Sequence, residues 1–394
     1  MQEGRTPLCP SRPKSKGMVK KMIKLQFAAP CLFGVEGILA EELRRLGAEE
    51  VLAENGRVLF SGGEEMVARA NICSRYAERI LILLGRFTAR TFTELFDQVK
   101  ALPFEDFIGR EDAFPVKGWT LESALHSLPD CQSIIKKAIV ERLKTVYRTD
   151  WFQETGAKLS IQFSIHKDEV SVMLDTSGAG LHKRGYRRNA ADAPLKETLA
   201  AAMAYVTRLY PDTQLYDPFC GSGTILIESA MLALGIAPGR NRTFAAEKFG
   251  CFDAGIWREE RARALSPTAG NEGFMAFGSD IDPAAVTLTL ENAKKAGVQS
   301  FVQAKTADIA DFVLPEGRAC VITNPPYGER LLSPEAAAGL VRTMGQKMPR
   351  EAGKRYSIIS PDEEFERRFG RPADKRRKLY NGMIKCQLYM YFRK

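Results

Sequence analysis

The segment Ala319–Arg330 reads Ala-Cys-Val-Ile-Thr-Asn-Pro-Pro-Tyr-Gly-Glu-Arg. Its first five residues form a short apolar, partly β-branched run, which predicts a buried strand. The two prolines that follow cannot continue a strand, so the strand must end before them. We therefore expect the polar side chain of Asn324 and the ring of Tyr327 at the carboxyl end of a strand. Open α/β sheets bind their ligands at such strand ends.

The Asn-Pro-Pro-Tyr sequence at 324–327 suits the methylation of an exocyclic amino group on a base. The side-chain carbonyl of Asn324 and the backbone carbonyl of Pro325 could each accept one N–H of that amine and so hold its nitrogen in place. Tyr327 could stack on the base. The predicted catalytic residues are Asn324, Pro325, Pro326 and Tyr327. Taken alone, the tetrapeptide is also compatible with a strand that runs into an inert Pro-Pro loop.

Three further signals follow earlier predicted strands. The loop Asp-Pro-Phe-Cys-Gly-Ser-Gly-Thr at 217–224 opens a helix, and its glycines let the backbone pass close beneath a ligand. No Gly-Lys-Ser/Thr follows, so it is not a Walker phosphate loop. Asp280 ends the next strand and is suited to bidentate binding of ribose hydroxyls, a device that NAD enzymes share. Asp308 follows the third strand and could accept from an adenine amino group. Because Asn324 has no role in hydride transfer, the four signals together favour a methyltransferase over a dehydrogenase. The residues predicted from these signals to bind the cofactor are Asp217, Pro218, Cys220, Gly221, Ser222, Gly223, Thr224, Asp280, Ile281 and Asp308.

The C-terminal half alternates strands with helices, which is typical of a doubly wound parallel sheet. Its predicted strands are 214–217, 275–280, 301–306, 319–323 and 355–359. A closing hairpin is predicted from strands at 378–380 and 383–392, with its turn at Asn381-Gly382. The roughly 40 residues between the helix 225–234 and Met275 exceed an ordinary connection, so we expect an insertion that Trp257 holds in place.

The N-terminal half reads as two α+β modules. Residues 23–87 follow the order βαββαβ of a small ferredoxin-like unit. Its predicted strands are 24–28, 50–53, 57–60 and 79–87, and its helices are 35–46 and 64–72. The second module covers 88–175. Its predicted helices are 93–101 and 131–147, and its strands are 158–166 and 169–175. This module shows no catalytic constellation, and the three histidines of the chain stand apart from one another.

Charge and cysteine usage place limits on the function. The net charge is +9, but seven Lys/Arg against Glu3 in residues 1–24 supply +6 of it, so only +3 remains for the rest. Local basic clusters at 183–188 and 367–378 could contact phosphates or could simply be solvated. The eight cysteines include no Cys-x-x-Cys pair, no secretory signal is present, and no apolar run is long enough to span a membrane. We therefore expect a reduced, cytoplasmic protein without a metal site.

Longer strings of residues resemble a known family. Asp217–Thr224, Gly278–Asp282 and Asn324–Tyr327 resemble motifs I, II and IV of class I S-adenosylmethionine-dependent amino-methyltransferases. The strings Lys183–Arg187, Ala193–Glu197 and Asn324–Arg330 resemble a narrower group, the bacterial THUMP-domain methyltransferases that act on guanine N2 of large-subunit ribosomal RNA. Members of that group are often labelled N6-adenine-specific DNA methylases.

This resemblance covers residues 23–394 and implies a Rossmann-like class I methyltransferase domain behind a ferredoxin-like module and a THUMP RNA-binding module. The implied domains are a ferredoxin-like domain at 23–88, a THUMP domain at 89–180 and the methyltransferase at 190–394, preceded by a disordered basic leader at 1–22. The leader is either an RNA-binding arm or, as we favour, coding sequence upstream of the true start. The resemblance also places Pro194 near the cofactor, whereas Lys196 and Glu197 could be ordinary first-turn helix residues.

The predicted reaction is direct methyl transfer from S-adenosyl-L-methionine to the N2 amine of a guanine in 23S ribosomal RNA or its assembly precursor. Cys220 and Cys320 are not expected to act as nucleophiles, because free cysteines usually pack as small apolar groups. Glu329 could accept the guanine N1–H, or it could pair with Arg330.

Alternative functions are an N6-adenine methyltransferase acting on RNA or DNA, a tRNA guanine-N2 methyltransferase, and a non-enzymatic RNA-binding ribosome assembly factor.

Overall fold

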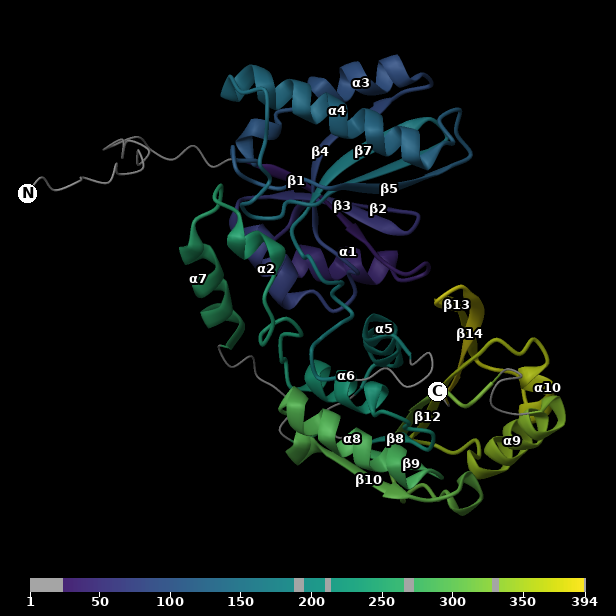
Figure 1. Ribbon diagram of the computed structural model, residues 1–394. Helices are drawn as coiled ribbons and strands as arrows, with labels where there is room; N and C mark the ends of the chain where they lie inside the picture. The colour runs from purple at the N-terminus through teal and green to yellow at the C-terminus, as the bar shows by residue number, and fades with distance from the viewer. Residues whose placement is uncertain (1–23, 188–194, 210–213, 266–272, 328–332, 393–394) are drawn as a thin grey trace, which may run out of the picture.

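The computed structural model describes residues 24–187, 195–209, 214–265, 273–327 and 333–392 (Figure 1). Two seven-stranded sheets form the two halves of the molecule. Among the described residues, none of the helices combines the length and the apolar character that a membrane crossing requires. The predicted fold class, a Rossmann-like domain behind ferredoxin-like and THUMP modules, is confirmed. The leader falls outside the described residues.

The N-terminal sheet has the strand order β2-β3-β1-β4-β7-β6-β5. Its strands are β1 (Leu25–Pro30), β2 (Glu49–Glu54), β3 (Arg57–Gly62), β4 (Leu81–Thr88), β5 (Val116–Leu121), β6 (Ile161–His166) and β7 (Glu169–Asp175). β4 pairs with β1 on one side and with β7 on the other, so the two predicted modules share one continuous sheet. β5 was not predicted from the sequence; it pairs in parallel with β6 at the sheet edge.

The helices of this half supply the apolar residues that cover the sheet. They are α1 (Glu36–Arg45), α2 (Glu65–Cys73), α3 (Phe92–Lys100), the short 3-10 helix η1 (Phe104–Asp106) and α4 (Leu128–Tyr147). A capping box between Thr91 and Glu94 satisfies the first backbone N–H groups of α3. In α4 the buried residues Ile135, Ala138 and Ile139 recur at helical spacing, as the sequence predicted.

The C-terminal sheet has the strand order β10-β9-β8-β11-β12-β14-β13. Its strands are β8 (Gln214–Asp217), β9 (Ala276–Asp280), β10 (Val302–Thr306), β11 (Ala319–Thr323), β12 (Lys354–Ser360), β13 (Lys375–Asn381) and β14 (Ile384–Phe392). The first five are parallel, whereas β14 runs antiparallel to both β12 and β13. The chain reverses its direction of progress between β8 and β11, so the carboxyl ends of these two strands form the topological switch point at which such sheets bind ligands.

Helices cover both faces of the C-terminal sheet. They are α5 (Glu197–Thr207), α6 (Thr224–Ala233), α8 (Pro283–Ala296), α9 (Pro334–Lys347) and α10 (Phe365–Phe369), with the 3-10 helices η3 (Gln299–Phe301) and η4 (Ile309–Asp311). Cys320 and Ile322 of β11 belong to the large core that contains α5 and α6. Val321 belongs to a separate core that contains residues of α9 and α10. The alternation follows from the two-residue period of a strand, and it makes β11 a strand buried on both faces.

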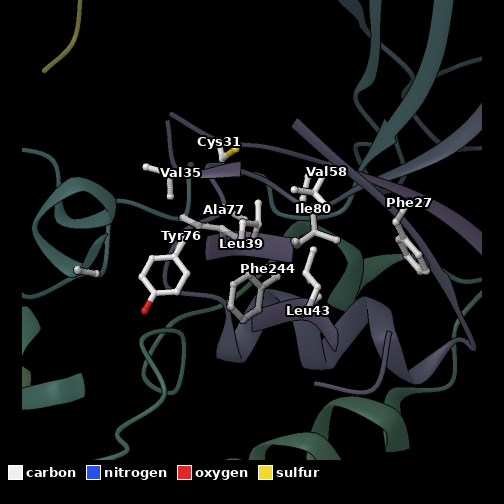
Figure 2. Packing of buried hydrophobic residues seen from close by; sticks show 14 of the residues in the cluster. Phe27, Cys31, Val35, Leu39, Leu43, Val58, Tyr76, Ala77, Ile80 and Phe244 are labelled. Atoms are coloured by element: carbon white, nitrogen blue, oxygen red, sulfur yellow. The ribbon is translucent and has the colours of Figure 1, made fainter. Parts of the chain in front are cut away.

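The predicted insertion joins the two halves. It contains the 3-10 helix η2 (Ala245–Lys248) and α7 (Ala254–Leu265), and α7 packs against α2 of the N-terminal half. Trp257 is buried and stacks on Phe244, with 5.4 Å between the ring centroids. Figure 2 shows Phe244 among side chains of the N-terminal half, including Leu43 and Tyr76. The insertion therefore contributes to the core of the other half as well as to its own local packing.

Polar contacts also fix the two halves together. Glu78, which precedes β4, accepts hydrogen bonds from Lys196 Nζ at 3.0 Å and Thr198 Oγ1 at 2.6 Å, both at the start of α5. Its carboxylate also lies 3.0 Å from His182 Nδ1. Burial alone would raise the pKa of Glu78, but the hydrogen bonds from His182, Thr198 and Lys196 lower this pKa to about 2. Glu78 is therefore a fully ionised link between the halves at neutral pH.

The ion pair between Arg69 of α2 and Glu260 of α7 gives a stability test of this interface. Two hydrogen bonds join the side chains, at 2.9 Å from Nε and 2.7 Å from Nη2, and both side chains are largely buried. Glu260→Ala leaves the Arg69 charge buried without this partner, so we expect the free energy of unfolding to fall by about 3 kcal/mol. The exposed neighbour Glu259 supplies a control, since Glu259→Ala is expected to change it by no more than about 0.5 kcal/mol. If Glu260→Ala and Glu259→Ala lower the free energy of unfolding in urea by the same amount, the ion pair has no structural role.

Candidate functional site

A cavity of about 740 Å³ opens at the carboxyl ends of β8, β9, β10 and β11. The predicted site residues that line it are Asp217, Pro218, Cys220, Gly221, Ser222, Thr224, Asp280, Ile281, Asp308, Asn324 and Pro326. They come from all four of the strand ends that the sequence singled out. Gly223, Pro325 and Tyr327 are described but do not line the cavity, and Pro194 lies outside the described residues.

The glycine loop is held by hydrogen bonds from both sides. Gly221 N donates to Asp280 Oδ2 at 2.9 Å, and Cys220 N donates to Ser279 O at 3.0 Å, so the loop is fastened to the end of β9. Gly223 has φ 78°, and a Cβ there would lie 2.8 Å from Thr289 Cγ2. This position therefore requires glycine both for its backbone conformation and for its close contact with α8.

Residues of α8 that the sequence analysis missed hold the loop from below. Thr289 Oγ1 donates to Gly221 O at 2.8 Å, and Asn292 Nδ2 donates to Ser222 O at 3.0 Å. Both side chains are buried, and they point into the loop because they lie on the face of α8 that packs on the sheet. Polar residues on the inner face of a helix are the signal that could have identified them.

Asp280 is oriented by its neighbours. Its Oδ2 accepts from Gly221, and its Oδ1 accepts from the backbone N–H of Asp282 at 3.1 Å. The side chain of Asp282 in turn caps α8 by accepting from Ala284 N. Asp280 is half-buried, whereas Ile281 beside it is 70% exposed on the cavity. A carboxylate next to an exposed apolar side chain fits a nucleoside, with the carboxylate towards the ribose and the apolar side chain against the base.

Asp308 lies on the same cavity, at the start of η4. Its Oδ1 accepts from Ala310 N at 2.7 Å, which caps this short helix and sets the direction of the carboxylate. The side chain is exposed. The arrangement is compatible with the predicted contact to an adenine amino group.

Asp217 is buried beneath the loop and hydrogen-bonded to β11. Its Oδ1 accepts from Thr323 Oγ1 at 2.6 Å and from Phe219 N at 3.1 Å. Burial raises the pKa of Asp217 to about 7, and the nearby charge of Asp280 acts in the same direction, while the bond from Thr323 opposes the rise. Asp217 therefore supports the loop from beneath.

Asn324 directly follows β11 and lines the cavity. Its Oδ1 is buried and has no hydrogen-bond donor among the described residues. A buried carbonyl oxygen without a donor is costly, so its presence beside a cavity indicates a ligand that carries an N–H or O–H group.

Tyr327 is positioned by the C-terminal hairpin. Asn381 Nδ2 donates to Tyr327 Oη at 2.7 Å, and burial raises the pKa of Tyr327 to about 12, so the phenol stays neutral at physiological pH. Gly328, Glu329 and Arg330 lie outside the described residues, and with them the predicted acceptor for a guanine N1–H.

The two cysteines nearest the site are buried thiols. Cys220 lies in the glycine loop and Cys320 lies in β11, and burial raises the pKa of each to about 12. Both groups are therefore protonated at neutral pH, in line with the prediction that neither is a nucleophile. Across the described ranges, no three His, Cys, Asp or Glu side chains are grouped so that they could bind a metal ion.

The half-buried Arg187 connects the segment 183–187 to the glycine loop. Arg187 Nη1 lies 3.3 Å from both Thr224 Oγ1 and Leu195 O, and its Nη2 forms an ion pair with Glu197 Oε2 at 2.7 Å. Thr224 and Leu195 both line the cavity. Arg187 and Glu197 each lie in a segment that resembles the family, but the contact between them could not be predicted from the sequence.

Comparison with known proteins gives three family matches and several close relatives. Models described as the RMKL-like methyltransferase domain, the RlmL ferredoxin-like domain and the THUMP domain match residues 184–390, 26–81 and 89–175. The chain is 42% identical over 376 residues to "Putative RNA methyltransferase YpsC" of Bacillus subtilis, covering 95% of this chain and 97% of that protein.

A second relative is longer than this chain. "Ribosomal RNA large subunit methyltransferase K/L" of Shewanella baltica is 32% identical over 376 residues, and the match covers 93% of this chain but only 53% of that protein. Among solved structures, that of SMU.472, "a putative methyltransferase complexed with SAH", is 38% identical with a TM-score of 0.88, covering 94% of this chain and 98% of that one.

The raised pKa of Asp217 predicts how its substitution affects stability at different pH values. Between about pH 4 and pH 7 the unfolded chain releases the Asp217 proton while the folded chain keeps it, so this residue makes stability fall as pH rises, by up to about 1.4 kcal/mol per pH unit. Asp217→Asn removes this titration and retains an oxygen that can accept from Thr323. The variant should therefore gain stability relative to the unsubstituted chain as pH rises from 4 to 7. Denaturant unfolding across this range measures the difference, and a difference independent of pH would refute the shifted pKa.

Proposed function

The chain belongs to the RMKL-like methyltransferase family, and on that premise we propose that it methylates the exocyclic N2 amine of a guanine in 23S ribosomal RNA. It is an RNA methyltransferase that uses S-adenosyl-L-methionine. The observation that carries the proposal is the position of Asn324. Its Oδ1 is buried and lacks a donor among the described residues, and the residue lines the cavity at the end of β11, next to the loop and the acids suited to the cofactor.

The cofactor fits the types of residue that line the cavity. Asp280 would bind the ribose hydroxyls, Ile281 would cover the adenine, Asp308 would accept from its amino group, and the loop 217–224 would lie beneath the remainder. When bound, S-adenosyl-L-methionine supplies a methyl group that is already activated by its sulfonium. The protein therefore has to position the amine against that methyl group.

Asn324 and Pro325 would orient the target amine. Asn324 Oδ1 and the Pro325 carbonyl each accept one N–H, which holds the nitrogen and directs its lone pair towards the methyl group. Tyr327 would stack on the ring as a neutral phenol, and its hydroxyl is held by Asn381. An asparagine amide does not take up a proton, so the proton of the methylated amine leaves to water. Because a paired base is inaccessible, the target must be unpaired or flipped out of its stack.

Ribosomal RNA is favoured as substrate because of the relatives and the N-terminal half. The THUMP model matches 89–175, and the K/L relatives are named as ribosomal RNA large subunit methyltransferases. A ferredoxin-like and THUMP half that is fastened to the catalytic half would hold the RNA around the target nucleotide. An adenine-N6 activity on RNA or DNA and a guanine-N2 activity on tRNA remain the alternatives that the experiments below separate. A purely non-enzymatic assembly factor would not need an amide oxygen that lacks a donor among the described residues at this cavity.

The division of roles between Asp280 and Asn324 can be tested separately from the substrate. Asp280→Ala removes the ribose acceptor and the acceptor of Gly221 N, so S-adenosylhomocysteine affinity measured by calorimetry should fall about ten- to a hundredfold. Asn324→Ala should leave this affinity nearly unchanged and abolish turnover. Asp311→Ala, an exposed carboxylate at the end of η4, is the matched control that should alter neither. Equal loss of cofactor binding in the Asp280 and Asn324 variants would overturn the assignment.

The product decides between guanine and adenine. Both bases present an NH₂ group to the same two carbonyls, but guanine N1–H is a donor whereas adenine N1 is an acceptor. We expect purified enzyme with labelled cofactor and undermodified 23S ribosomal RNA to place its label in N2-methylguanosine after digestion to nucleosides. Transfer RNA and DNA, offered in parallel, should accept little label. Label recovered only in N6-methyladenosine would refute the choice of base, and preferential labelling of tRNA would refute the choice of RNA.

A further inference from the structure

The hairpin β13–β14 carries positive charge that the catalytic site does not use. Residues 375–392 contain five Lys/Arg and no Asp or Glu. Arg376 pairs with Glu366, and Arg377 donates to the backbone carbonyl of Gly34. Lys375, Lys378 and Lys385 are exposed and, within the part of the chain that the structure describes, have no carboxylate partner within 4.0 Å. The hairpin therefore presents cations that are available to an anionic partner.

The turn of this hairpin is next to the catalytic residues. It brings Asn381 and Ile384 into register across Gly382 and Met383. Asn381 Nδ2 donates to Tyr327 Oη at 2.7 Å, which places the turn beside the tyrosine that would stack on the target base. Met383 is 98% exposed and Ile384 is 49% exposed. Two large apolar side chains in solvent beside an active site indicate a surface that substrate covers.

The other side of the hairpin meets the N-terminal half. Arg377 Nη2 donates to Gly34 O at 2.8 Å, so the loop after β1 covers the outer edge of β13. The ring of Phe33 is 54% exposed and packs edge-on against Tyr380, with centroids 5.8 Å apart. Lys378 Nζ lies 5.4 Å from the centre of the Tyr380 ring. Aromatic rings and an exposed cation are thus grouped where the N-terminal half meets the catalytic half, and Figure 1 shows β13 and β14 reaching towards the N-terminal half.

We propose that this hairpin surface binds the unpaired nucleotides that adjoin the target nucleotide in RNA. The hairpin surface consists of Phe33, Lys378, Tyr380, Met383 and Lys385, whereas Ile384 lies with Asn381 on the opposite face of the hairpin. Bases would stack on Phe33 and Tyr380 and pack against Met383, and phosphates would contact Lys378 and Lys385. The contact of Asn381 with Tyr327 makes the turn a continuation of the base pocket. This proposal rests on the proposed RNA methyltransferase function, and it adds a binding site for the unpaired RNA on either side of the target nucleotide.

Two substitutions of opposite charge at position 383 test whether this surface binds RNA. The probe is a labelled single-stranded RNA of mixed sequence, about 12 nucleotides long to fit a typical single-strand site, and fluorescence anisotropy of the full chain measures its affinity. Met383→Glu should weaken RNA binding about tenfold, and Met383→Lys should preserve or strengthen it, because only the sign of the charge differs. The difference between the two variants should shrink as salt is raised. Phe33→Ala should also weaken binding, and Phe33→Tyr should restore it.

Leu265 provides the matched control. It is 66% exposed at the end of α7, which lies on the opposite side of the molecule from β13 in Figure 1. Leu265→Glu and Leu265→Lys should differ less than twofold in RNA affinity. S-adenosylhomocysteine affinity should be unchanged in both Met383 variants, which verifies that they fold.

Three outcomes separate this inference from the function on which it rests. If the two Met383 variants bind RNA equally well and the unsubstituted chain binds normally, the hairpin surface is not an RNA site. An acidic protein would then be the alternative partner for this surface. If the unsubstituted chain labels 23S ribosomal RNA but does not bind the probe, only the hairpin surface is overturned. Absence of label in 23S ribosomal RNA would refute the proposed function, and the hairpin inference with it.

Discussion

The hydrogen bond from Thr323 Oγ1 to Asp217 Oδ1 joins the two strands on which the whole site depends. Both residues are fully buried, and they end β11 and β8, the neighbours at the switch point of the sheet. One residue after Thr323 comes Asn324, and directly after Asp217 comes the glycine loop. The bond therefore fixes the distance between the residues suited to hold a target amine and those suited to hold a methyl donor. Methyl transfer requires the two reacting atoms to be held close and in line, and effective molarity is lost when such a distance varies.

The same requirement extends to the N-terminal half. If that half holds RNA, its position relative to Asn324 determines where the target base arrives. The structure fixes this position with charged and polar contacts, among them Glu78 with Lys196 and Thr198, and Arg69 with Glu260. Buried ion pairs contribute little net stability, because desolvation offsets most of their attraction. They do penalise any shifted arrangement, since a displaced partner leaves a buried charge unpaired. We attribute the use of polar contacts at this interface to the need for one defined orientation.

Much of the fold could be predicted because each decisive signal is local. The Asn381-Gly382 pair predicted a hairpin turn, which the structure places one residue later at Gly382-Met383. Asp280 and Asn324 each mark the end of a strand within a few residues. The missed strand β5 shows the limit. This edge strand alternates exposed and half-buried residues, the exposed ones being Lys117, Trp119 and Leu121. Gly118 interrupts the apolar pattern. Gly118 is there because a Cβ would lie 2.3 Å from Phe163 O of β6, which is a tertiary constraint. Propensity alone ranks glycine low in strands, so the local signal pointed the other way.

The contacts that support the site could not be predicted from the sequence, for the same reason. Thr323 and Asp217 are 106 positions apart, and Arg187 and Thr224 are 37 apart, so no spacing rule connects them. What the sequence does contain is the residues that face a ligand, because their types follow from the chemistry of that ligand. The residues that hold them in place need only the right donor or acceptor at the right point of the fold. Thr289 and Asn292 illustrate this, since their partners are backbone carbonyls of the loop. A different fold would meet the same need with different residue types, so a pattern search for the ligand-facing residues does not extend to those that support them.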